Sequence, residues 1–290
     1  MKRIITVQDI SCVGKCSLTV ALPIISAMGV EAAILPTAVL STHTMFQGFT
    51  FHDLTKEITP ICEHWKKEKI SYDAIYTGYL GSFEQLDLMK KMFADFKGKK
   101  TLVVVDPCMA DNGKLYTGFT QDFAFAMAKL AGLADVILPN MTEASFMLGV
   151  EYKAKGYDLD YVKDMLKKLA SLGSKKVILK GIEFDKPQPG IKNVKGKIGI
   201  ACYDAKTKKF SFYFHEKQKT SFHGTGDIFA SVVVASLMRG ATLENSYKLA
   251  ADFVEESIKE TVSHKNHNTY GVDFEACFPF LLKKLAKVIK

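Results

Sequence analysis

Apolar and polar positions along the chain predict short buried strands that alternate with amphipathic helices. Short apolar runs bounded by polar residues predict strands at Arg3–Val7, Ala32–Val39, Ala74–Tyr76, Thr101–Val105, Val136–Leu138 and Lys176–Leu179. Several of these runs are continuously apolar, which is typical of strands buried on both faces of a parallel sheet. Helical periodicity lies between them, at Ser17–Met28, Asp53–Glu68, Phe83–Phe96, Gln121–Leu133 and Leu159–Ala170.

One stretch departs from this alternation of strand and helix. Lys197–Tyr203 and Lys209–Phe214 are strand-like runs joined by Asp204–Lys208, which predicts an antiparallel hairpin. A mostly helical tail follows, over Thr225–Met238, Leu243–Val262 and Phe274–Ile289. No linker rich in proline, glycine or serine interrupts the pattern, so we expect a single domain over residues 1–290. The predicted fold class is α/β, with a mostly parallel central sheet flanked by helices on both faces and a small antiparallel hairpin.

Composition excludes several classes of protein. No stretch approaches the roughly 18 apolar residues of a membrane span, and the first apolar run is too short for a signal peptide. We therefore expect a cytoplasmic protein whose six cysteines, which form no CxxC pair, are reduced thiols. The net charge of +8 is carried by lysines spread along the chain, which favours solvated helix faces over nucleic-acid binding. A mild positive field also suits a small anionic substrate such as a nucleotide.

Polar residues follow the predicted strands, which is where a ligand binds in an open α/β sheet. The segment Gly224-Thr225-Gly226-Asp227 precedes the apolar run of a helix. Its glycines and the positive end of the helix dipole could form an anion site, and Asp227 could take a proton from a hydroxyl that attacks a bound phosphate. Thr225 or Asp227 could equally cap an ordinary helix after a glycine turn, and these residues alone leave both interpretations open.

Acidic residues follow two further strands. Asp106-Pro107 ends one strand and Asp111 lies five residues later, a pattern that suits a magnesium–phosphate site or a simple strand-terminating turn. Asn140 and Glu143 have the spacing of a capping box, and a capped helix end facing a cleft could also orient water bound to a metal.

Two residues near the beginning of the chain are further candidates. Asp9 follows the first strand, where a buried carboxylate needs a partner such as a protonated pyridine nitrogen, Lys15 or a backbone donor. His43 is isolated in the sequence, and a histidine without a partner is typically structural.

The chain has no GxxxxGK[ST] loop, no GxGxxG in its first βα turn and no nucleophile elbow, which excludes Walker-type ATP binding and disfavours a nicotinamide dehydrogenase.

Five segments, taken in order, resemble the ribokinase-like kinases and, within them, the pyridoxal (vitamin B6) kinases. The resemblance covers nearly the whole chain and is carried by TAVLSTHT (37–44), TGYLGSFEQ (77–85), VVVDPCMAD (103–111), LPNMTEASFMLG (138–149) and GTGDIFAS (224–231). Of these, STHT and TGYLGS are what favour a B6 kinase over a sugar kinase.

This resemblance implies ATP-dependent phosphorylation of the hydroxymethyl group of pyridoxal, pyridoxamine or pyridoxine. It implies a homodimer, which is typical of the family, that uses Mg²⁺ and often a monovalent cation such as K⁺. Its small-molecule partners would be the B6 vitamer and ATP, and we expect it to bind neither a membrane nor nucleic acid. By position, Asp227 resembles the general base, and the backbone of Gly224, Thr225 and Gly226 resembles the anion hole. The remaining implied residues are Asp9, His43, Thr44, Tyr79 and Cys16 for the vitamer, Asn140, Lys180, Gly181 and Thr225 for the nucleotide, and Asp106, Asp111 and Glu143 for magnesium.

Two features depart from the family pattern. Asp9 stands where many relatives have a serine that contacts the substrate ring, and residues 11–16 also differ, so Cys16 is carried over only by position. The Cys16 thiol could react with a substrate aldehyde or an oxidant, or it could be a buried, inert cysteine. A hydroxymethylpyrimidine kinase of the same superfamily and a non-catalytic vitamer-binding protein are the alternatives to a B6 kinase.

The aspartate at position 9 generates a prediction. We expect Asp9 to favour vitamers with a protonated pyridinium, such as pyridoxamine, so the substitution Asp9→Ser should change the relative kcat/KM values for pyridoxal, pyridoxamine and pyridoxine. Steady-state kinetics with each vitamer measures this. Unchanged ratios would contradict the hypothesis.

Overall fold

The computed structural model describes residues 1–289 and divides into two compact units. The first unit comprises Met1–Gly81, Lys91–Thr101 and Gln218–Lys290, and the second comprises Ser82–Lys90 and Leu102–Lys217. Helix α3 (Phe83–Phe96) begins in the second unit and ends in the first. The expectation of a single domain over the whole chain stays a prediction.

The first unit contains a sheet with the strand order β4-β1-β2-β3. Its strands are β1 (Arg3–Ser11), β2 (Glu31–Leu40), β3 (Phe51–Asp53) and β4 (Ala74–Thr77). Strand β1 is parallel to β2 and to β4, whereas β3 is antiparallel to β2. The helices of this unit are α1 (Leu18–Ala27), α2 (Thr55–Lys67), α7 (Thr225–Met238), α8 (Leu243–Ser263) and α9 (Phe278–Val288), with the 3₁₀ turn η1 (Phe274–Cys277) before α9.

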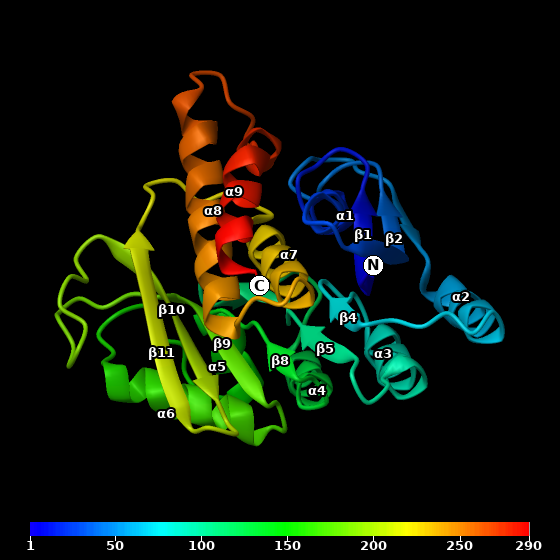
Figure 1. Ribbon diagram of the computed structural model, residues 1–290, viewed down its shortest axis with the longest axis horizontal. Helices are drawn as coiled ribbons and strands as arrows, with labels where there is room; N and C mark the ends of the chain where they lie inside the picture. The colour runs from blue at the N-terminus through cyan, green and yellow to red at the C-terminus, as the bar shows by residue number, and fades with distance from the viewer. Residues whose placement is uncertain (290) are drawn as a thin grey trace. The chain divides into compact units, whose positions relative to one another are not determined.

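Helix α7 lies at the centre of the helical layer of the first unit. Every residue from position 227 to position 236 is buried, as expected for a helix that is apolar on all sides. It packs against α1 and α8, and α8 in turn packs against α9 (Figure 1). Asp227 is the first residue of this buried run, so the packing of α7 fixes its place next to the glycine turn.

The second unit contains strands in the order β11-β10-β9-β8-β5. They are β5 (Leu102–Val105), β8 (Val136–Ile137), β9 (Lys176–Ile182), β10 (Lys197–Asp204) and β11 (Lys209–Glu216). Strands β5, β8 and β9 are parallel, and β9, β10 and β11 are antiparallel. The remaining elements are the hairpin β6 (Ala110–Asp111) and β7 (Lys114–Leu115) and the helices α4 (Gln121–Ala131), α5 (Met141–Leu148) and α6 (Leu159–Ser171), of which α6 packs on β9 and β10 (Figure 1).

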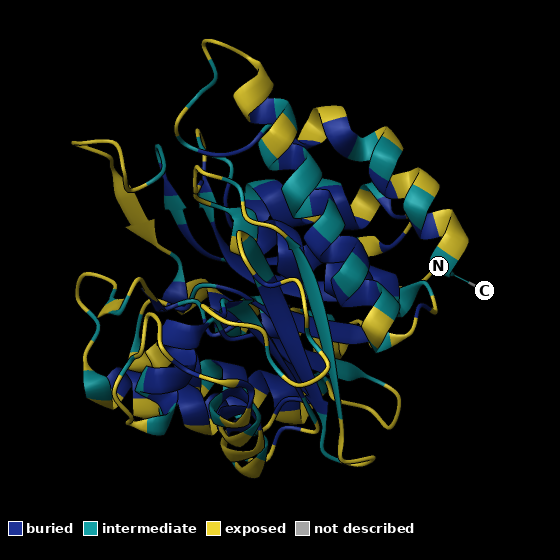
Figure 2. Ribbon diagram, turned by 90° about the vertical axis from the view of Figure 1, so that its left-hand side faces the viewer, coloured by how far each residue is buried: buried dark blue, intermediate teal, exposed yellow. Residues whose placement is uncertain are grey.

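Burial along the parallel strands confirms that both faces of the sheet are covered. Successive residues of a strand face opposite sides, and Val103, Val104 and Val105 of β5 are all fully buried, as are Ile4 and Ile5 of β1. In Figure 2 much of the strand ribbon is coloured as buried, while exposed residues lie mainly on helices and loops. The predicted α/β fold is therefore confirmed, and the predicted antiparallel hairpin is β10–β11.

The sequence pattern gave no range for helix α5, although the capping box indicated where it begins, and it missed three short strands. Strands β3, β6 and β7 have two or three residues each, too few for a period to be recognised. The predicted helix Phe274–Ile289 begins instead as the turn η1, and α9 starts at Phe278, where Pro279 occupies the first turn. Across residues 1–289, no helix is long and apolar enough to cross a membrane.

Candidate active site

The second unit brings together Asp106 and Asn140, which follow β5 and β8, and Lys180, which lies within β9. The ammonium of Lys180 donates to both carboxylate oxygens of Asp106, at 2.8 and 3.0 Å, and the backbone of Asn140 pairs with that of Lys180. The side chains of Asp106 and Lys180 are 4% and 15% exposed, so this ion pair is almost completely removed from water. Gly181 follows with a φ of +76°, a backbone conformation that favours glycine.

Asn140 and Glu143 form the capping box that their spacing predicts. The side-chain oxygen of Asn140 accepts from the Glu143 N–H at 2.8 Å, and Glu143 Oε2 accepts from the Asn140 N–H at 2.7 Å. The other carboxylate oxygen of Glu143 accepts from the Met109 N–H at 3.4 Å. The capping box thus holds Glu143 at the beginning of α5, where it also contacts the segment that follows β5.

Two buried carboxylates share one ammonium in this part of the molecule. Burial raises the pKa of Glu143 to about 8, Lys180 opposes that rise, and the negative charge of Asp106 adds to it. Burial lowers the pKa of Lys180, but Asp106 and Glu143 raise it by more, so the lysine stays charged. When all three groups are ionised the cluster has one excess negative charge, which a further cation would neutralise.

Asp111 makes its hydrogen bonds with Asn112 and not with the Asp106–Lys180 ion pair. It is an exposed residue of β6, and its carboxylate accepts from the backbone and side-chain nitrogens of Asn112 at 2.9 and 3.0 Å. Within the described part of the chain, no three His, Cys, Asp or Glu side chains are grouped closely enough to hold a metal ion. The assignment of Asp106, Asp111 and Glu143 to magnesium therefore stays a prediction.

In the first unit, Gly224 and Asp227 lie at the beginning of α7, as the sequence predicts. Gly224 is the N-cap residue with a φ of +77°, and Thr225 opens the helix, with its hydroxyl donating to the Phe222 carbonyl at 3.1 Å. A Cβ on Gly224 would overlap the Lys15 carbonyl oxygen, so both the backbone angle and the close approach require glycine here. Asp227 is buried, and its Oδ2 accepts from the Ser17 N–H at 2.8 Å.

Asp9 lies in the same part of the first unit. The register between β1 and β2 shifts between Gln8 and Ile10, a bulge that re-aims the side chain of Asp9. Asp9 is 7% exposed, and its carboxylate lies near the hydroxyls of Ser17 and Ser11. Burial raises the pKa of Asp9, and these hydroxyls oppose the rise.

Lys15, a candidate partner of Asp9, pairs instead with two other carboxylates. Its ammonium donates to Asp273 Oδ1 and to Glu275 Oε2, both at 2.8 Å. Lys15 therefore ties the loop after β1 to the segment before α9, and Asp9 is stabilised by hydroxyl groups.

His43 has a partner that the sequence pattern did not reveal. The expectation that it is isolated is wrong, because its ring lies 4.7 Å, between centroids, from that of His223. His43 Nδ1 accepts from the Met45 N–H at 3.1 Å, and burial, followed by the nearby His223, lowers the pKa of the ring. His43 is consequently neutral at pH 7. Next to it, Thr44 is exposed.

Tyr79 follows strand β4 and is half-buried. Gly78, the residue before it, lies against the side chain of Gln8, where a Cβ would come within 3.1 Å of two carbon atoms. The end of β4 therefore packs closely on the end of β1, immediately beside Asp9.

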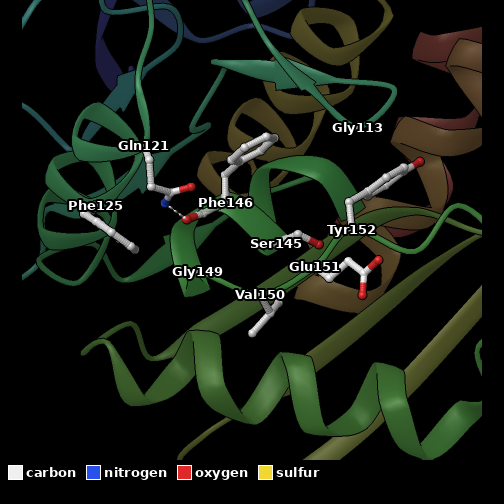
Figure 3. A pocket seen from close by; sticks show the side chains of 9 residues that line it. All are labelled: Gly113, Gln121, Phe125, Ser145, Phe146, Gly149, Val150, Glu151 and Tyr152. Atoms are coloured by element: carbon white, nitrogen blue, oxygen red, sulfur yellow. Dashed lines mark hydrogen bonds between the residues drawn. The ribbon is translucent and has the colours of Figure 1, made fainter.

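A cavity of about 350 Å³ in the second unit lies elsewhere. It is formed by α4, α5 and the segment after α5, and Gln121 donates to the Phe146 carbonyl across one side at 2.7 Å (Figure 3). The lining residues are Gly113, Gln121, Phe125, Ser145, Phe146, Gly149, Val150, Glu151 and Tyr152. None of them is a predicted site residue, so this cavity is separate from the candidate active site.

Comparison with known proteins identifies the family. Residues 21–272 match the sequence family described as phosphomethylpyrimidine kinase, which is most of the 290-residue chain. The chain belongs to the phosphomethylpyrimidine kinase family. It is therefore related to kinases of small molecules, in agreement with the ribokinase-like resemblance of its motifs.

Relatives of this phosphomethylpyrimidine kinase family member fall into two substrate groups. The hydroxymethylpyrimidine/phosphomethylpyrimidine kinase of Aquifex aeolicus is 28% identical over 216 residues, covering 71% of this chain and 77% of that protein. The pyridoxine kinase of Bacillus subtilis is 30% identical over 196 residues, covering 66% of each.

Solved structures confirm the fold. A candidate phosphomethylpyrimidine kinase from Bacteroides thetaiotaomicron, crystallised with pyridoxal, has a TM-score of 0.88 and 37% identity over 97% of this chain and 95% of that one. The pyridoxal kinase of Lactobacillus plantarum has a TM-score of 0.86 and 28% identity over 98% and 97% of the two chains.

Sequence reasoning missed three residues that contact the candidate site residues. Ser11 and Ser17 lie near Asp9, the Ser17 N–H donates to Asp227, and the ring of His223 contacts that of His43. His223 directly precedes Gly224, and this position beside the glycine turn is the only feature of the sequence that points to it. The serines had none, because Ser17 reaches Asp227 across 210 positions of sequence.

Cys16 lies near the carboxylates of Asp227 and Asp9, and this position generates a prediction. Burial raises the pKa of its thiol to about 12, and those two negative charges contribute to the rise. At pH 8 the thiol is protonated and unreactive, whereas Cys12 is exposed to reagents. Iodoacetamide should therefore modify Cys12 at least about tenfold faster than Cys16 in the folded protein, as measured by peptide mass spectrometry.

The control for this measurement is the same labelling in guanidinium chloride, where both thiols should react. A C12S variant identifies the fast-reacting site. Equal rates for Cys12 and Cys16 in the folded protein would contradict the prediction.

Proposed function

We propose that this chain is a B6 vitamer kinase that transfers the γ-phosphoryl group of ATP to the hydroxymethyl group of pyridoxal, pyridoxamine or pyridoxine. The observation that carries the chemistry is the buried carboxylate of Asp227 directly behind the glycine turn at the beginning of α7. The observation that supports the substrate is the Bacteroides thetaiotaomicron relative, matched over 97% of this chain and crystallised with pyridoxal.

Asp227 acts as the general base in this proposal. The substrate hydroxyl attacks the γ-phosphorus, an O–P bond forms, the bond to the β-phosphate oxygen breaks and ADP leaves. Asp227 accepts the hydroxyl proton, while the N–H groups of Thr225 and Gly226 at the helix N-terminus stabilise the charge on the transferred group. Asp9, His43, Thr44, Tyr79 and Cys16 are the proposed vitamer contacts.

The cluster in the second unit suits the charge of a nucleotide–metal complex. Asp106 and Glu143 supply buried oxygen ligands, a magnesium ion prefers oxygen ligands, and its charge would favour the ionised form of Glu143. These two residues would hold the ion, which would neutralise phosphate charge when bound, and Asp111 is the further ligand that the family resemblance implies. Lys180, Gly181 and Asn140 would contact the nucleotide.

Hydroxymethylpyrimidine is the second candidate substrate. The family match and the Aquifex aeolicus relative favour it, and its hydroxymethyl group on a heteroaromatic ring would place the same demand on Asp227. The homodimer, the potassium requirement and the cytoplasmic location stay predictions.

A substrate panel tests the proposed function. The purified protein is given ATP and Mg²⁺, with and without K⁺, and either pyridoxal, pyridoxamine, pyridoxine or hydroxymethylpyrimidine. We expect kcat/KM for the best vitamer to exceed that for the pyrimidine by about tenfold or more, measured as ADP release and as the mass of the phosphorylated product.

Two results of this panel would contradict the proposal. A preference for the pyrimidine would identify a hydroxymethylpyrimidine kinase. Binding of pyridoxal with no ADP release above the substrate-free rate would identify a non-catalytic vitamer-binding protein.

A further prediction concerns Asp227, the proposed general base. Asp227→Ala should lower kcat by about 10²- to 10⁴-fold, because proton transfer loses its acceptor, while the Kd for ATP changes little. Asp227→Asn is the matched variant that keeps the size of the side chain but cannot accept the proton. Calorimetry measures ATP binding, and turnover close to that of the unmodified protein in either variant would contradict the role of Asp227.

A further inference from the structure

Ser17 is held in a backbone conformation that serine rarely adopts. It is the N-cap residue of α1, with φ 49° and ψ −128°. A residue with a side chain keeps such angles only where its surroundings impose them, and such residues concentrate at functional sites. Unlike a typical N-cap serine, Ser17 makes no side-chain hydrogen bond to its own helix.

Both polar groups of Ser17 are directed to carboxylates. Its N–H donates to Asp227 Oδ2 at 2.8 Å in a buried environment, and its hydroxyl lies near the carboxylate of Asp9, whose charged form it stabilises. Asp9 lies at the bulge of β1, so the hydroxyl of Ser17 lies beside the sheet while its N–H donates to α7. One residue therefore links the acid after β1 to the acid of α7.

The loop of residues 11–17 is itself fixed from two other directions. The Lys15 carbonyl lies so close to Gly224 that any side chain there would overlap it. The Lys15 ammonium is held by Asp273 and Glu275 at 2.8 Å each. The loop is thus a rigid support on which the beginning of α7 rests.

We propose that Ser17 is a positioning residue for Asp227: its backbone, held in an unusual conformation with the hydroxyl beside Asp9, keeps its N–H directed at Asp227 Oδ2 and so orients the carboxylate. This inference rests on the proposed function in taking Asp227 as the general base. It assigns Ser17 no contact with the substrate or with ATP.

The hydrogen bond has a consequence that can be measured. A donor to the ionised carboxylate stabilises its charged form, so loss of the donor raises the pKa of the base. Cys16 in the 11–17 loop is a titratable group near both Asp227 and Asp9, whereas the ammonium of Lys15 is paired with Asp273 and Glu275. Cys16 is protonated throughout the neutral range, so it does not obscure the titration of the base.

Kinetics of Ser17→Ala test the proposal. Without the hydroxyl beside Asp9 the backbone can leave the strained conformation, and we expect kcat to fall by about 10- to 100-fold with little change in the KM for ATP. The acidic limb of the pH profile of kcat/KM should move to higher pH. The matched control is Ser236→Ala, which removes the hydroxyl of another buried serine at the far end of α7, where no partner is found for its oxygen; its kinetics should be unchanged.

A double-mutant cycle separates this inference from the proposed function. If Ser17 acts through Asp227, Asp227→Ala and the double variant S17A/D227A should have equal kcat values. An active Asp227→Ala variant would overturn the role of Asp227 as the base. An inactive Asp227→Ala variant together with an unchanged kcat and pH profile in Ser17→Ala would overturn the inference alone.

A spectroscopic measurement needs no activity and no folded Ser17 variant. In protein labelled with ¹⁵N-serine, the Ser17 amide proton should titrate with the Asp227 carboxylate and should move upfield in Asp227→Asn, because it no longer faces a charged acceptor. The Ser236 amide serves as the internal reference. A Ser17 resonance that is the same in both proteins at every pH would overturn the proposal.

Discussion

The structure depends on one electrostatic constraint: a carboxylate removed from water must be given a charged or hydrogen-bonding partner by the fold. Asp106 receives the ammonium of Lys180, Glu143 receives two backbone N–H groups, and Asp227 receives the N–H of Ser17. These partners come from the ends of other strands and from neighbouring loops. The same arrangement that makes burial tolerable also fixes the direction of each acid.

The partners differ in chemistry, and the difference separates the roles proposed for the two units. In the second unit a charged lysine pairs with Asp106, and Glu143, whose pKa of about 8 keeps it mostly protonated at pH 7, would ionise beside a bound cation. In the first unit, Asp9 lies beside serine hydroxyls and Asp227 accepts from a serine N–H, and these donors are neutral. A site for a metal–nucleotide complex needs the first arrangement, and a general base needs the second.

Much of the local architecture could be predicted from sequence. The βα alternation, the capping box of Asn140 and Glu143, and the glycine turn before Asp227 all depend on residues within a few positions of one another, and each is present. The family resemblance of the motifs was likewise confirmed by the match over residues 21–272. The short strands β3, β6 and β7 could not be predicted, because they depend on pairing with a neighbour and not on a local period.

By itself, the sequence determined which residue types follow each strand, where the long elements begin, and which glycines precede Asp227. Only the tertiary structure decided which partner each acid takes: Lys180 for Asp106, 74 positions away, Ser17 for Asp227, and hydroxyls in place of Lys15 for Asp9. The physical reason is that helices and turns are stabilised by neighbours in the chain, whereas a buried charge is stabilised by whichever donor the folded backbone brings within hydrogen-bonding distance. No local pattern records that distance, and the chemistry of this site depends on it.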